Sequence, residues 1–432
     1  MVLAQTMGSF LGIILLEERV FYYPEYVFYA ARCSDYIKSK ELRQLKRVLI
    51  LANHFITLYA FRREIIQKLI KIGYEVYISL PRSSKNIYFE KLGCKVIPTK
   101  IARRSINPVG DVKLILFYRK LFLSIKPDVI LSYTIKPNIY GSIVSNSLNI
   151  TQICNITGTG GLFLKKSFLS ALCTVLYRHS VRNCKKVFFQ NKDDFEFFAK
   201  NRMIADNGEV IPGSGCNVER FALSHMPNGK NVNFIFAGRI MKNKGIEEYL
   251  QCAERIKKKH PDINFYIAGW FEEKKYKGIV EDYQRRGIVK YCGFTEDIRE
   301  LMGRCHCAVL PSHGGEGVPN VLLEAAAMGR ICVSSDISGA REAVVGGENG
   351  FLFEVGNADS LAEAVEKVIL LTDAQRDEMG RNGREKVEKL FDRRIVINKY
   401  LDEVKDSEQI CKSGGGAADR SGQSFADKAI SF

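Results

Sequence analysis

The sequence predicts an α/β protein of two Rossmann-like domains whose parallel sheets face each other across a cleft. Three observations predict this fold. The chain has 432 residues, which is more than one ordinary domain. In both halves, short apolar runs typical of strands alternate with longer amphipathic stretches typical of helices. The strand-like runs are apolar almost throughout, as in parallel strands that helices cover on both faces.

The strand-like runs form two groups of four, one in each half of the chain. They lie at 48–52, 76–80, 129–133 and 187–190, and then at 234–237, 265–268, 308–310 and 331–334. We therefore expect a first domain over 46–213 and a second over 214–390. Neither group has G-x-G-x-x-G after its first strand, which counts against a dinucleotide-dependent dehydrogenase.

The two ends of the chain fall outside these domains. Residues 1–45 form an N-terminal extension whose apolar part, 2–16, is shorter than a membrane-spanning helix and lacks the features of a signal peptide. An extra helical pair, a membrane-docking element and an artefact of start-codon choice all stay open for it. At the other end, a helix is expected at 391–411, and the polar residues 412–432 are expected to be disordered.

Charge is distributed unevenly along the chain. Residues 1–215 contain 32 basic and 15 acidic residues, a balance of +17, whereas residues 216–432 contain 32 and 33. This asymmetry suggests an anionic partner for the first domain. A membrane surface is favoured over nucleic acid, because no nucleic-acid motif is present.

One expected helix bears on this membrane hypothesis. Residues 165–178 carry basic residues at both ends and an apolar face of Phe168, Leu169, Leu172, Val175 and Leu176. Such a helix can lie in a membrane interface. The alternative interpretation is a helix that packs on the core of the first domain and has solvated basic ends. Both interpretations are compatible if only one edge of the helix contacts lipid.

The cysteines do not indicate a metal site. Twelve occur, and no C-x-x-C is present. In Cys305-His306-Cys307, the histidine would point away from both cysteines on a strand, so we interpret the cluster as structural. Scattered cysteines of this kind fit a reducing cytoplasm. No D-x-D motif occurs, so we expect no metal at a nucleotide site and no other cofactor.

The segment 313–325, His-Gly-Gly-Glu-Gly-Val-Pro-Asn-Val-Leu-Leu-Glu-Ala, carries the strongest functional signal. A strand-like run precedes it and a helical pattern follows, so its glycine-rich loop leads into a helix N-terminus that suits a diphosphate. Glu316 in the loop can accept hydrogen bonds from sugar hydroxyls, and Glu324 in the helix can reach a ribose. Taken alone, the loop could also be an ordinary surface turn with a capping glutamate.

A second segment places two cations after a strand. The run 233–237 ends in Gly238-Arg239, and Lys244-Gly245 then opens a helix. Ligands of open α/β sheets bind outside the carboxyl ends of the strands, so Arg239 and Lys244 can neutralise a diphosphate there. A solvated basic turn is the simpler alternative.

Together, the Gly-Arg and Lys-Gly pairs and the later E-x7-E segment resemble the retaining GT-B glycosyltransferases of family 4, also called group one. The resemblance implies the GT-B fold, with Arg239, Lys244 and Glu316 as catalytic residues. It also implies a nucleotide-sugar site, whose residues would be Gly238, Arg239, Lys244, Gly315, Glu316, Gly317, Val318, Asn320 and Glu324.

The resemblance extends to the domain boundary and the first domain. Residues 211–221 are similar to the interdomain turn of this family, and the last helix would cross back onto the first domain, where the acceptor binds. The motifs T-x-K-P-N-x-Y-G at 134–141 and N-I-T-G-x-G at 155–160 resemble a subgroup that extends lipid-linked oligosaccharides, although the usual histidine is missing. The acceptor-side candidates are His54, Lys136, Asn138, Gly158 and Gly160, with His54 favoured as a hydrogen-bonded loop residue.

These implications give one functional prediction. A hexose or N-acetylhexosamine moves from a nucleotide diphosphate sugar, UDP-linked, to a lipid-diphosphate-linked glycan with retention, in surface polysaccharide biosynthesis. The enzyme would be cytoplasmic and peripheral on the inner face of the cell membrane, would meet that anionic surface with its first domain, and would need no metal. A GT-B epimerase acting on a UDP-sugar and a catalytically silent binding subunit are the alternatives.

Overall fold

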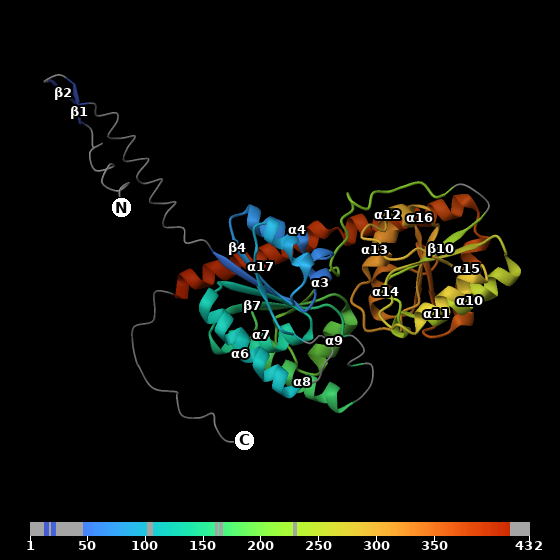
Figure 1. Ribbon diagram of the computed structural model, residues 1–432, viewed down its shortest axis with the longest axis horizontal. Coiled ribbons are helices and arrows are strands. Elements are labelled where there is room, and N and C mark those ends of the chain that lie inside the picture. The colour runs from blue at the N-terminus through green and yellow to red at the C-terminus, as the bar shows by residue number, and fades with distance from the viewer. Residues whose placement is uncertain are drawn as a thin grey trace.

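The computed structural model describes strands at 13–16 and 19–22 and residues 46–101, 107–159, 163, 167–227 and 231–414. It has two lobes, one blue to green and one yellow to orange in Figure 1. The early strands, β1 (Ile13–Leu16) and β2 (Arg19–Tyr22), pair antiparallel with each other. The alternative of an extra helical pair in the N-terminal extension is therefore wrong for these eight residues, which form strands.

The first domain is built on a seven-stranded parallel sheet with the order β5-β4-β3-β6-β7-β8-β9. Strand β6 is fully buried and β3 is buried except at Arg47, as predicted from their continuous apolar runs. Its strands are β3 (Arg47–Leu51), β4 (Glu75–Leu80), β5 (Lys95–Pro98), β6 (Val129–Tyr133), β7 (Thr151–Ile156), β8 (Lys186–Phe189) and β9 (Gly208–Val210).

The second domain is built on a six-stranded parallel sheet with the order β12-β11-β10-β13-β14-β15. Two apolar clusters, one on each face of this sheet, form its core. Its strands are β10 (Asn233–Ala237), β11 (Asn264–Ala268), β12 (Lys290–Tyr291), β13 (Cys307–Leu310), β14 (Ile331–Ser335) and β15 (Gly350–Phe353). The predicted α/β fold of two Rossmann-like domains is confirmed.

Helices follow the strands and cover both sheets. In the first domain they are α3 (Phe55–Tyr59), α4 (Arg63–Lys71), α5 (Ile87–Lys91), α6 (Pro108–Ile125), α7 (Ile135–Ser147), α8 (Phe168–Ser180) and α9 (Lys192–Lys200). In the second they are α10 (Ile246–Lys259), α11 (Tyr276–Arg285), α12 (Arg299–Gly303), α13 (Asn320–Ala327), α14 (Ser338–Ala343), α15 (Ala358–Leu370) and α16 (Asp373–Leu390). Among the residues described, no helix is both long and apolar enough to cross a bilayer.

The last helix, α17 (Arg393–Gly414), lies along the first domain (Figure 1). Its Val396, Tyr400 and Val404 are buried in the same cluster as β3 and β6 of that domain. The Tyr400 ring lies 4.9 Å from the ring of Phe188 in β8. The helix continues to Gly414, three residues beyond the end expected from the sequence.

The orientation of α8 differs from a simple core-facing helix. Cys173 and Tyr177 are buried, whereas Phe168, Leu172 and Val175 of the predicted apolar face are exposed. The core-facing interpretation is therefore wrong for these three side chains.

Candidate active site

Two adjoining cavities occupy the cleft between the domains. One, of about 530 Å³, is lined mainly by aromatic and aliphatic side chains and contains Glu324; we call it the aromatic cavity. The other, of about 380 Å³, contains Arg239, Lys244 and Glu316; we call it the polar cavity. Gly238, Trp270 and Asn320 line both, so the two cavities adjoin at these residues.

The backbone between β10 and α10 places Lys244. This loop makes one turn of 3-10 helix at Lys242–Lys244 and then reaches Gly245, which has φ +74° and begins α10. A Cβ at Gly245 would lie 1.8 Å from the carbonyl oxygen of Pro311, at the end of β13. Only glycine allows this approach, which brings Lys244 next to the loop that carries Glu316.

Lys244 forms an ion pair with Glu316 inside the polar cavity. The Ser312 hydroxyl donates a second hydrogen bond to the same carboxylate, at 2.6 Å. Burial by itself would raise the pKa of Glu316, but Lys244, Ser312 and Arg239 outweigh it and lower that pKa below its ordinary value. Glu316 is therefore ionised at neutral pH and fixed in position before any ligand arrives.

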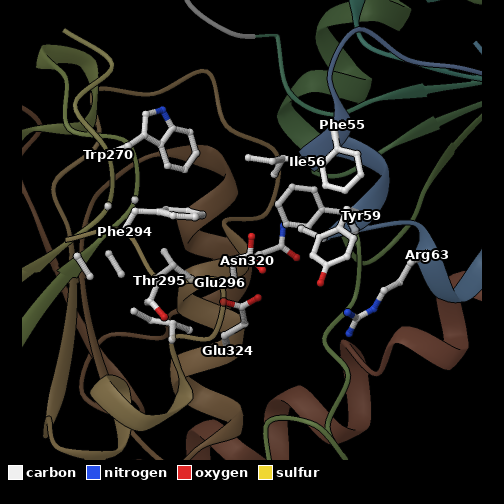
Figure 2. Close-up of a pocket in the computed structure, with 18 of the residues that line it drawn as sticks. Phe55, Ile56, Tyr59, Arg63, Trp270, Phe294, Thr295, Glu296, Asn320 and Glu324 are labelled. Carbon is white, nitrogen blue, oxygen red and sulfur yellow. The ribbon is translucent and has the colours of Figure 1, made fainter. Parts of the chain in front are cut away.

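Glu324 lies in a different environment, one turn into α13 at the floor of the aromatic cavity (Figure 2). Burial raises its pKa to about 7, although Arg393 and Arg220 partly oppose this effect. The rings of Trp270 and Phe294 lie on one side of this cavity, 5.5 Å apart, and Tyr59 lies on the other. This arrangement can take a flat apolar ring and a pair of hydroxyl groups next to one carboxylate.

Helix α13 directs its N-terminus into the shared part of the two cavities. It begins at Asn320, and its N-cap residue, Pro319, makes no side-chain capping bond. No capping side chain therefore accepts hydrogen bonds from the first backbone amides of the helix. These amides lie where Asn320 and Val321 line both cavities. Together with Arg239, these amides can stabilise an anion such as a diphosphate.

The first domain supplies the opposite wall of the polar cavity. His54 caps α3 by accepting a 3.2 Å hydrogen bond from the amide of Ile56, which agrees with a loop role for this histidine. Thr134 has φ +75°, which is rare for a β-branched residue, and its buried hydroxyl has no hydrogen-bond partner among the described residues. Strain of this kind is concentrated at functional sites.

Arg62 is buried beneath this wall. Its guanidinium carbon lies 4.9 Å from the ring centre of Tyr133 and 5.9 Å from that of Tyr400, so it packs against aromatic faces. Within the described parts of the chain, it forms no ion pair with a carboxylate. The cleft thus has a buried positive charge under its first-domain wall as well as the two cations of the second domain.

The two domains touch at the glycine motifs singled out from the sequence. The amide of Gly317 donates to the carbonyl of Thr157 at 3.2 Å, and the Asn191 side chain donates to the carbonyl of Glu316 at 3.3 Å. Gly158 has φ +110°, and a Cβ there would lie 2.5 Å from the nitrogen of Gly317. Gly158 therefore forms a domain contact next to the polar cavity.

Two acceptor-side candidates lie away from the cavities. Lys136 forms a 2.6 Å ion pair with Asp111 of α6 and lines neither cavity. Asn138 is buried, accepts a hydrogen bond from Ser132 and donates one to the carbonyl of Asn155, so it holds α7 to the sheet. Their assignment to acceptor binding is not supported by these positions, because contacts within the fold engage both side chains. Gly160 lies outside the described residues.

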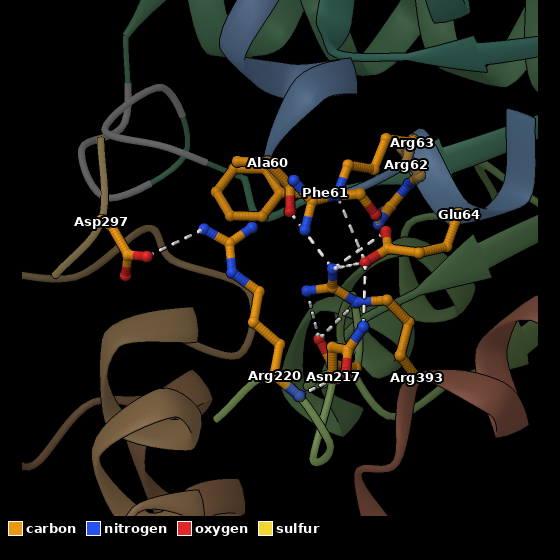
Figure 3. Close-up of polar contacts among 10 residues, drawn as sticks. Ala60, Phe61, Arg62, Arg63, Glu64, Asn217, Arg220, Asp297 and Arg393 are labelled. Carbon is orange, nitrogen blue, oxygen red and sulfur yellow. Dashed lines mark hydrogen bonds and ion pairs between the residues drawn. The ribbon is translucent and has the colours of Figure 1, made fainter. Parts of the chain in front are cut away.

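A polar network around the buried Arg393 joins the domain boundary to the first domain (Figure 3). Arg393 donates to both oxygens of Glu64 at 3.0 and 3.1 Å and also donates to the carbonyl of Gly215. Asn217 donates to Glu64 at 3.4 Å. Burial by itself would raise the pKa of Glu64. Arg393, a backbone hydrogen bond, Arg63 and Asn217 together lower that pKa below its ordinary value, so this carboxylate stays ionised. We call Glu64, Asn217 and Arg393 the hinge network.

The Cys305-His306-Cys307 cluster is part of the fold. The His306 ring contacts the amide of Asn233 at 3.1 Å and the carbonyl of Pro227 at 3.1 Å. Both nitrogens of the His306 ring are thus hydrogen-bonded to backbone groups. Over the described ranges, no group of three or more His, Cys, Asp or Glu side chains is arranged to hold a metal ion.

Sequence reasoning missed several cavity residues. Trp270 and Phe294 follow β11 and β12, and the motif comparison gave no sign that their rings would meet. Tyr59 and Thr134 come from the opposite domain, so only the tertiary fold brings them to the cleft. Ser312 offered a signal, because it lies four residues before Glu316 in the same loop.

Family comparisons match both domains. Residues 219–386 match the glycosyl transferases group 1, and residues 47–191 match the glycosyl transferase 4-like family. The first match covers the sheet of the second domain, and the second covers the sheet of the first domain except β9.

Several characterised or named proteins are similar in sequence. The N,N'-diacetylbacillosaminyl-diphospho-undecaprenol alpha-1,3-N-acetylgalactosaminyltransferase of Campylobacter jejuni is 27% identical over 82% of this chain and 97% of its own length. The capsular polysaccharide biosynthesis glycosyltransferase CapM of Staphylococcus aureus is 28% identical over 70% of this chain and 82% of its own. The UDP-Gal:alpha-D-GlcNAc-diphosphoundecaprenol alpha-1,3-galactosyltransferase of Escherichia coli is 25% identical over 70% of this chain and 80% of its own.

Solved structures share the fold at low sequence identity. A glycosyltransferase of Rickettsia africae superposes with a TM-score of 0.70 at 17% identity, covering 85% of this chain and 99% of its own. Anabaena HepE, solved with UDP and glucose, superposes with a TM-score of 0.68 at 18% identity, covering 84% and 100%. The family models match both parallel-sheet domains, and these solved structures share their fold. The chain therefore belongs to the group 1 glycosyltransferases of the GT-B fold.

Proposed function

We propose that this glycosyltransferase moves a hexose or N-acetylhexosamine from a UDP-sugar to a lipid-diphosphate-linked glycan, with retention and hence an α-linkage, in surface polysaccharide biosynthesis. The observation that carries the proposal is the adjoining pair of cavities, with Lys244, Glu316 and Arg239 in one and Glu324 among aromatic rings in the other. The Campylobacter and Escherichia coli relatives support it, because their names specify diphospho-undecaprenol acceptors and alpha-1,3 transfer.

In this proposal the donor spans both cavities. The base lies against Trp270 and Phe294, and the ribose hydroxyls bond to Glu324. The diphosphate lies at the N-terminus of α13, and the sugar lies in the polar cavity, where Glu316 accepts hydrogen bonds from its hydroxyls. The distribution of polar and aromatic residues between the cavities supports this orientation.

The main catalytic contribution is charge stabilisation of the leaving diphosphate. As the bond from the sugar C1 to the phosphate oxygen breaks, negative charge grows on that oxygen, next to Arg239, Lys244 and the α13 amides. Groups fixed in advance in a water-poor site stabilise such charge strongly. These cations supply the role that a metal has in other nucleotide sites, so we expect EDTA to leave the rate unchanged.

Retention follows in this proposal from displacement on one face of the sugar. The acceptor oxygen bonds to C1 on the face that the diphosphate leaves, and the acceptor proton passes to a diphosphate oxygen. Among the described residues, no first-domain carboxylate lines the polar cavity, and Glu316 there is already paired with Lys244. A covalent glycosyl adduct on a carboxylate, detected by mass spectrometry, would contradict this route.

The reaction is proposed to take place at the inner face of the cell membrane. A lipid-linked acceptor is held there, and the +17 balance of residues 1–215 suits an anionic membrane surface.

The test is release of nucleotide diphosphate from UDP-, GDP- and ADP-sugars, with and without lipid-diphosphate-linked saccharides. Release from a UDP-sugar should rise with the acceptor and disappear in Glu316→Ala, but persist in Glu348→Ala, an exposed position of the same domain. Free UDP together with a 2-epimer and no transferred sugar would support an epimerase instead. No release from any donor would refute catalysis by this site.

A further inference from the structure

Two helices of the first domain direct apolar side chains outward. Phe168 on α8 is 87% exposed, and Val109 and Leu116 on α6 are 63% and 61% exposed. Large apolar side chains exposed in groups commonly mark an interaction surface. We call this group the α6–α8 face; its members are Val109, Val112, Leu116, Phe168, Leu172 and Val175.

The spacing of these residues aligns them along each helix. On α6 they are three and four positions apart, and on α8 four and three, so each set forms one stripe. The opposite sides of the helices bury Leu114 and Tyr118 of α6 and Cys173 and Tyr177 of α8. The outward stripes are therefore additional to the faces that pack in the core.

The two stripes belong to one side of the domain. Both helices pack against α7 and lie on the same outer side of the first sheet in Figure 1. Asp111 in the first turn of α6 pairs with Lys136 in the first turn of α7. The same carboxylate contributes, after burial, to a raised pKa of Cys173 in α8. The first half of α6 thus lies near α8.

The face also lies close to the cleft. Helices α6, α7 and α8 follow β5, β6 and β7, so their N-termini lie at the carboxyl edge of the sheet. That edge faces the cavities, since His54 and Thr134 there line the polar cavity. Val109, Val112 and Leu116 on α6 and the stripe on α8 lie toward the N-terminal ends of their helices, near the rim of the cleft. Leu123, which is 50% exposed, continues the α6 stripe away from the rim.

Charge around the face has one sign. Exposed basic residues flank the stripes, whereas the only acid on α6 is Asp111, which is paired with Lys136, and α8 has none. The flanking basic residues are Lys113, Arg119, Lys120, Arg178 and Arg182. A second copy of this face would bring like charges together. Anionic lipid headgroups over an apolar layer match both its charge and its apolar side chains.

We propose that the α6–α8 face docks on an anionic lipid bilayer, with its apolar stripes in the headgroup boundary and its basic residues on lipid phosphates. This inference rests on the proposed function and deepens it, because it names the surface that brings the cleft to a lipid-linked acceptor. The rim position lets the acceptor glycan enter the polar cavity while its lipid stays in the bilayer.

The test is co-sedimentation of the full chain with vesicles of phosphatidylcholine alone or mixed with phosphatidylglycerol. We expect binding to the mixed vesicles, weakened by salt. Phe168→Glu with Leu172→Glu, and Val112→Glu with Leu116→Glu, should each reduce partitioning by about tenfold or more. The matched control, Leu370→Glu with Leu390→Glu, changes two exposed leucines of the second domain and should bind like the parent protein. Equal melting temperatures verify that every variant folds.

Three results would overturn the docking proposal: no binding to mixed vesicles, equal binding to neutral vesicles, or face variants that bind like the parent. A concentration-dependent dimer that the glutamates disrupt would instead make the face a protein interface. Transfer to a short-chain, detergent-soluble acceptor separates the two proposals. If face variants keep that transfer, the chemistry is independent of docking. If the parent binds vesicles but transfers to no lipid-diphosphate saccharide, the proposed function fails and the docking surface stands.

Discussion

At the scale of single residues, Lys244 and Glu316 show that charged side chains of the second domain are held in position without a ligand. Each side chain of the pair is only 17% exposed, and Ser312 adds a hydrogen bond that fixes the carboxylate. A site arranged in this way needs little reorganisation when the diphosphate leaves, which is why such groups have large effects on rate.

We therefore expect Lys244→Ala to lower kcat/KM by about 10²- to 10³-fold. The reason is loss of the cation beside the leaving group together with a Glu316 carboxylate left without its counter-ion. Initial rates of UDP release measure this effect. Lys242→Ala is the control, because Lys242 is exposed in the same loop and lines neither cavity. Equal losses in the two variants would contradict the assignment.

Glu324 gives a pH prediction. Its pKa is raised to about 7, so the carboxylate that would accept hydrogen bonds from a ribose is charged only above that pH. The KM for the donor should therefore rise as pH falls through about 7, and Glu324→Gln should remove this dependence. Donor titrations from pH 6 to 8, on the order of one unit either side of the pKa, measure it.

The same shift has a consequence for stability, with a definite sign. A glutamate whose folded pKa lies above its unfolded value favours the folded state at low pH and loses that contribution as pH rises from about 4.5 to about 7. Above pH 7 the buried charge is a full cost to folding. Glu324→Gln should then melt at a higher temperature than the parent at pH 8, while binding the donor more weakly. A lower melting temperature would contradict this account.

At the scale of elements, the loop between β10 and α10 depends on one glycine. Alanine at Gly245 would need a left-handed backbone and would also place a Cβ 1.8 Å from the Pro311 carbonyl oxygen. Gly73 also has a positive φ, but nothing lies within 4 Å of a Cβ there. Comparison of the two separates backbone strain from steric overlap.

We expect Gly245→Ala to destabilise the protein more than Gly73→Ala, by about 1–3 kcal/mol, the usual cost of overpacking. Urea unfolding measures the difference. Gly245→Ala should also weaken UDP binding, because the loop carries Lys244, whereas Gly73→Ala should not. Similar effects of both substitutions would show that the contact with Pro311 relaxes easily.

The predicted strands show which elements a sequence reveals. All eight apolar runs are strands, within a residue or two at their ends. Three of the missed strands have specific reasons: β5 is a half-exposed edge strand, and β12 has only two residues. Strand β7 lies inside the sheet but contains Gln152 and Asn155, which are buried. The Gln152 amide bonds to Ser132 and Ser142, so a buried strand here carries polar residues that its sequence alone does not explain.

At the scale of the whole molecule, the second-domain side of the cleft follows from sequence and the first-domain side does not. Arg239, Lys244, Glu316 and Glu324 come from continuous motifs of one domain, so their order along the chain limits their geometry. The first-domain wall depends on how α3 and β6 meet the other domain. Asn138 illustrates the limit, since its motif suggested ligand binding and its side chain instead ties α7 to the sheet.

The hinge network gives a prediction at this scale. Arg393→Met should destabilise the protein by about 3 kcal/mol, because the half-buried Glu64 carboxylate loses its two-bond partner and keeps the longer contacts with Arg63 at 3.5 Å and Asn217 at 3.4 Å. It should also raise the KM for the donor, since Arg393 lines the aromatic cavity near Glu324. Urea unfolding and donor titration measure the two effects.

The paired variant Glu64→Gln with Arg393→Met is the control for charge. Removing both charges should recover part of the lost stability. Independent, additive losses would show that the two residues do not act as a pair.

The return of α17 to the first domain also affects how the protein is made. Val396, Tyr400 and Val404 complete the core of the first domain, yet the ribosome adds them after the entire second domain. Domains generally fold in the order of their synthesis. Here the earlier domain stays incomplete, with Tyr133 and Phe188 uncovered, until the last helix emerges. Both domains are therefore finished at nearly the same moment, and a nascent chain stalled at the domain boundary would present an apolar groove to chaperones or to other unfinished chains.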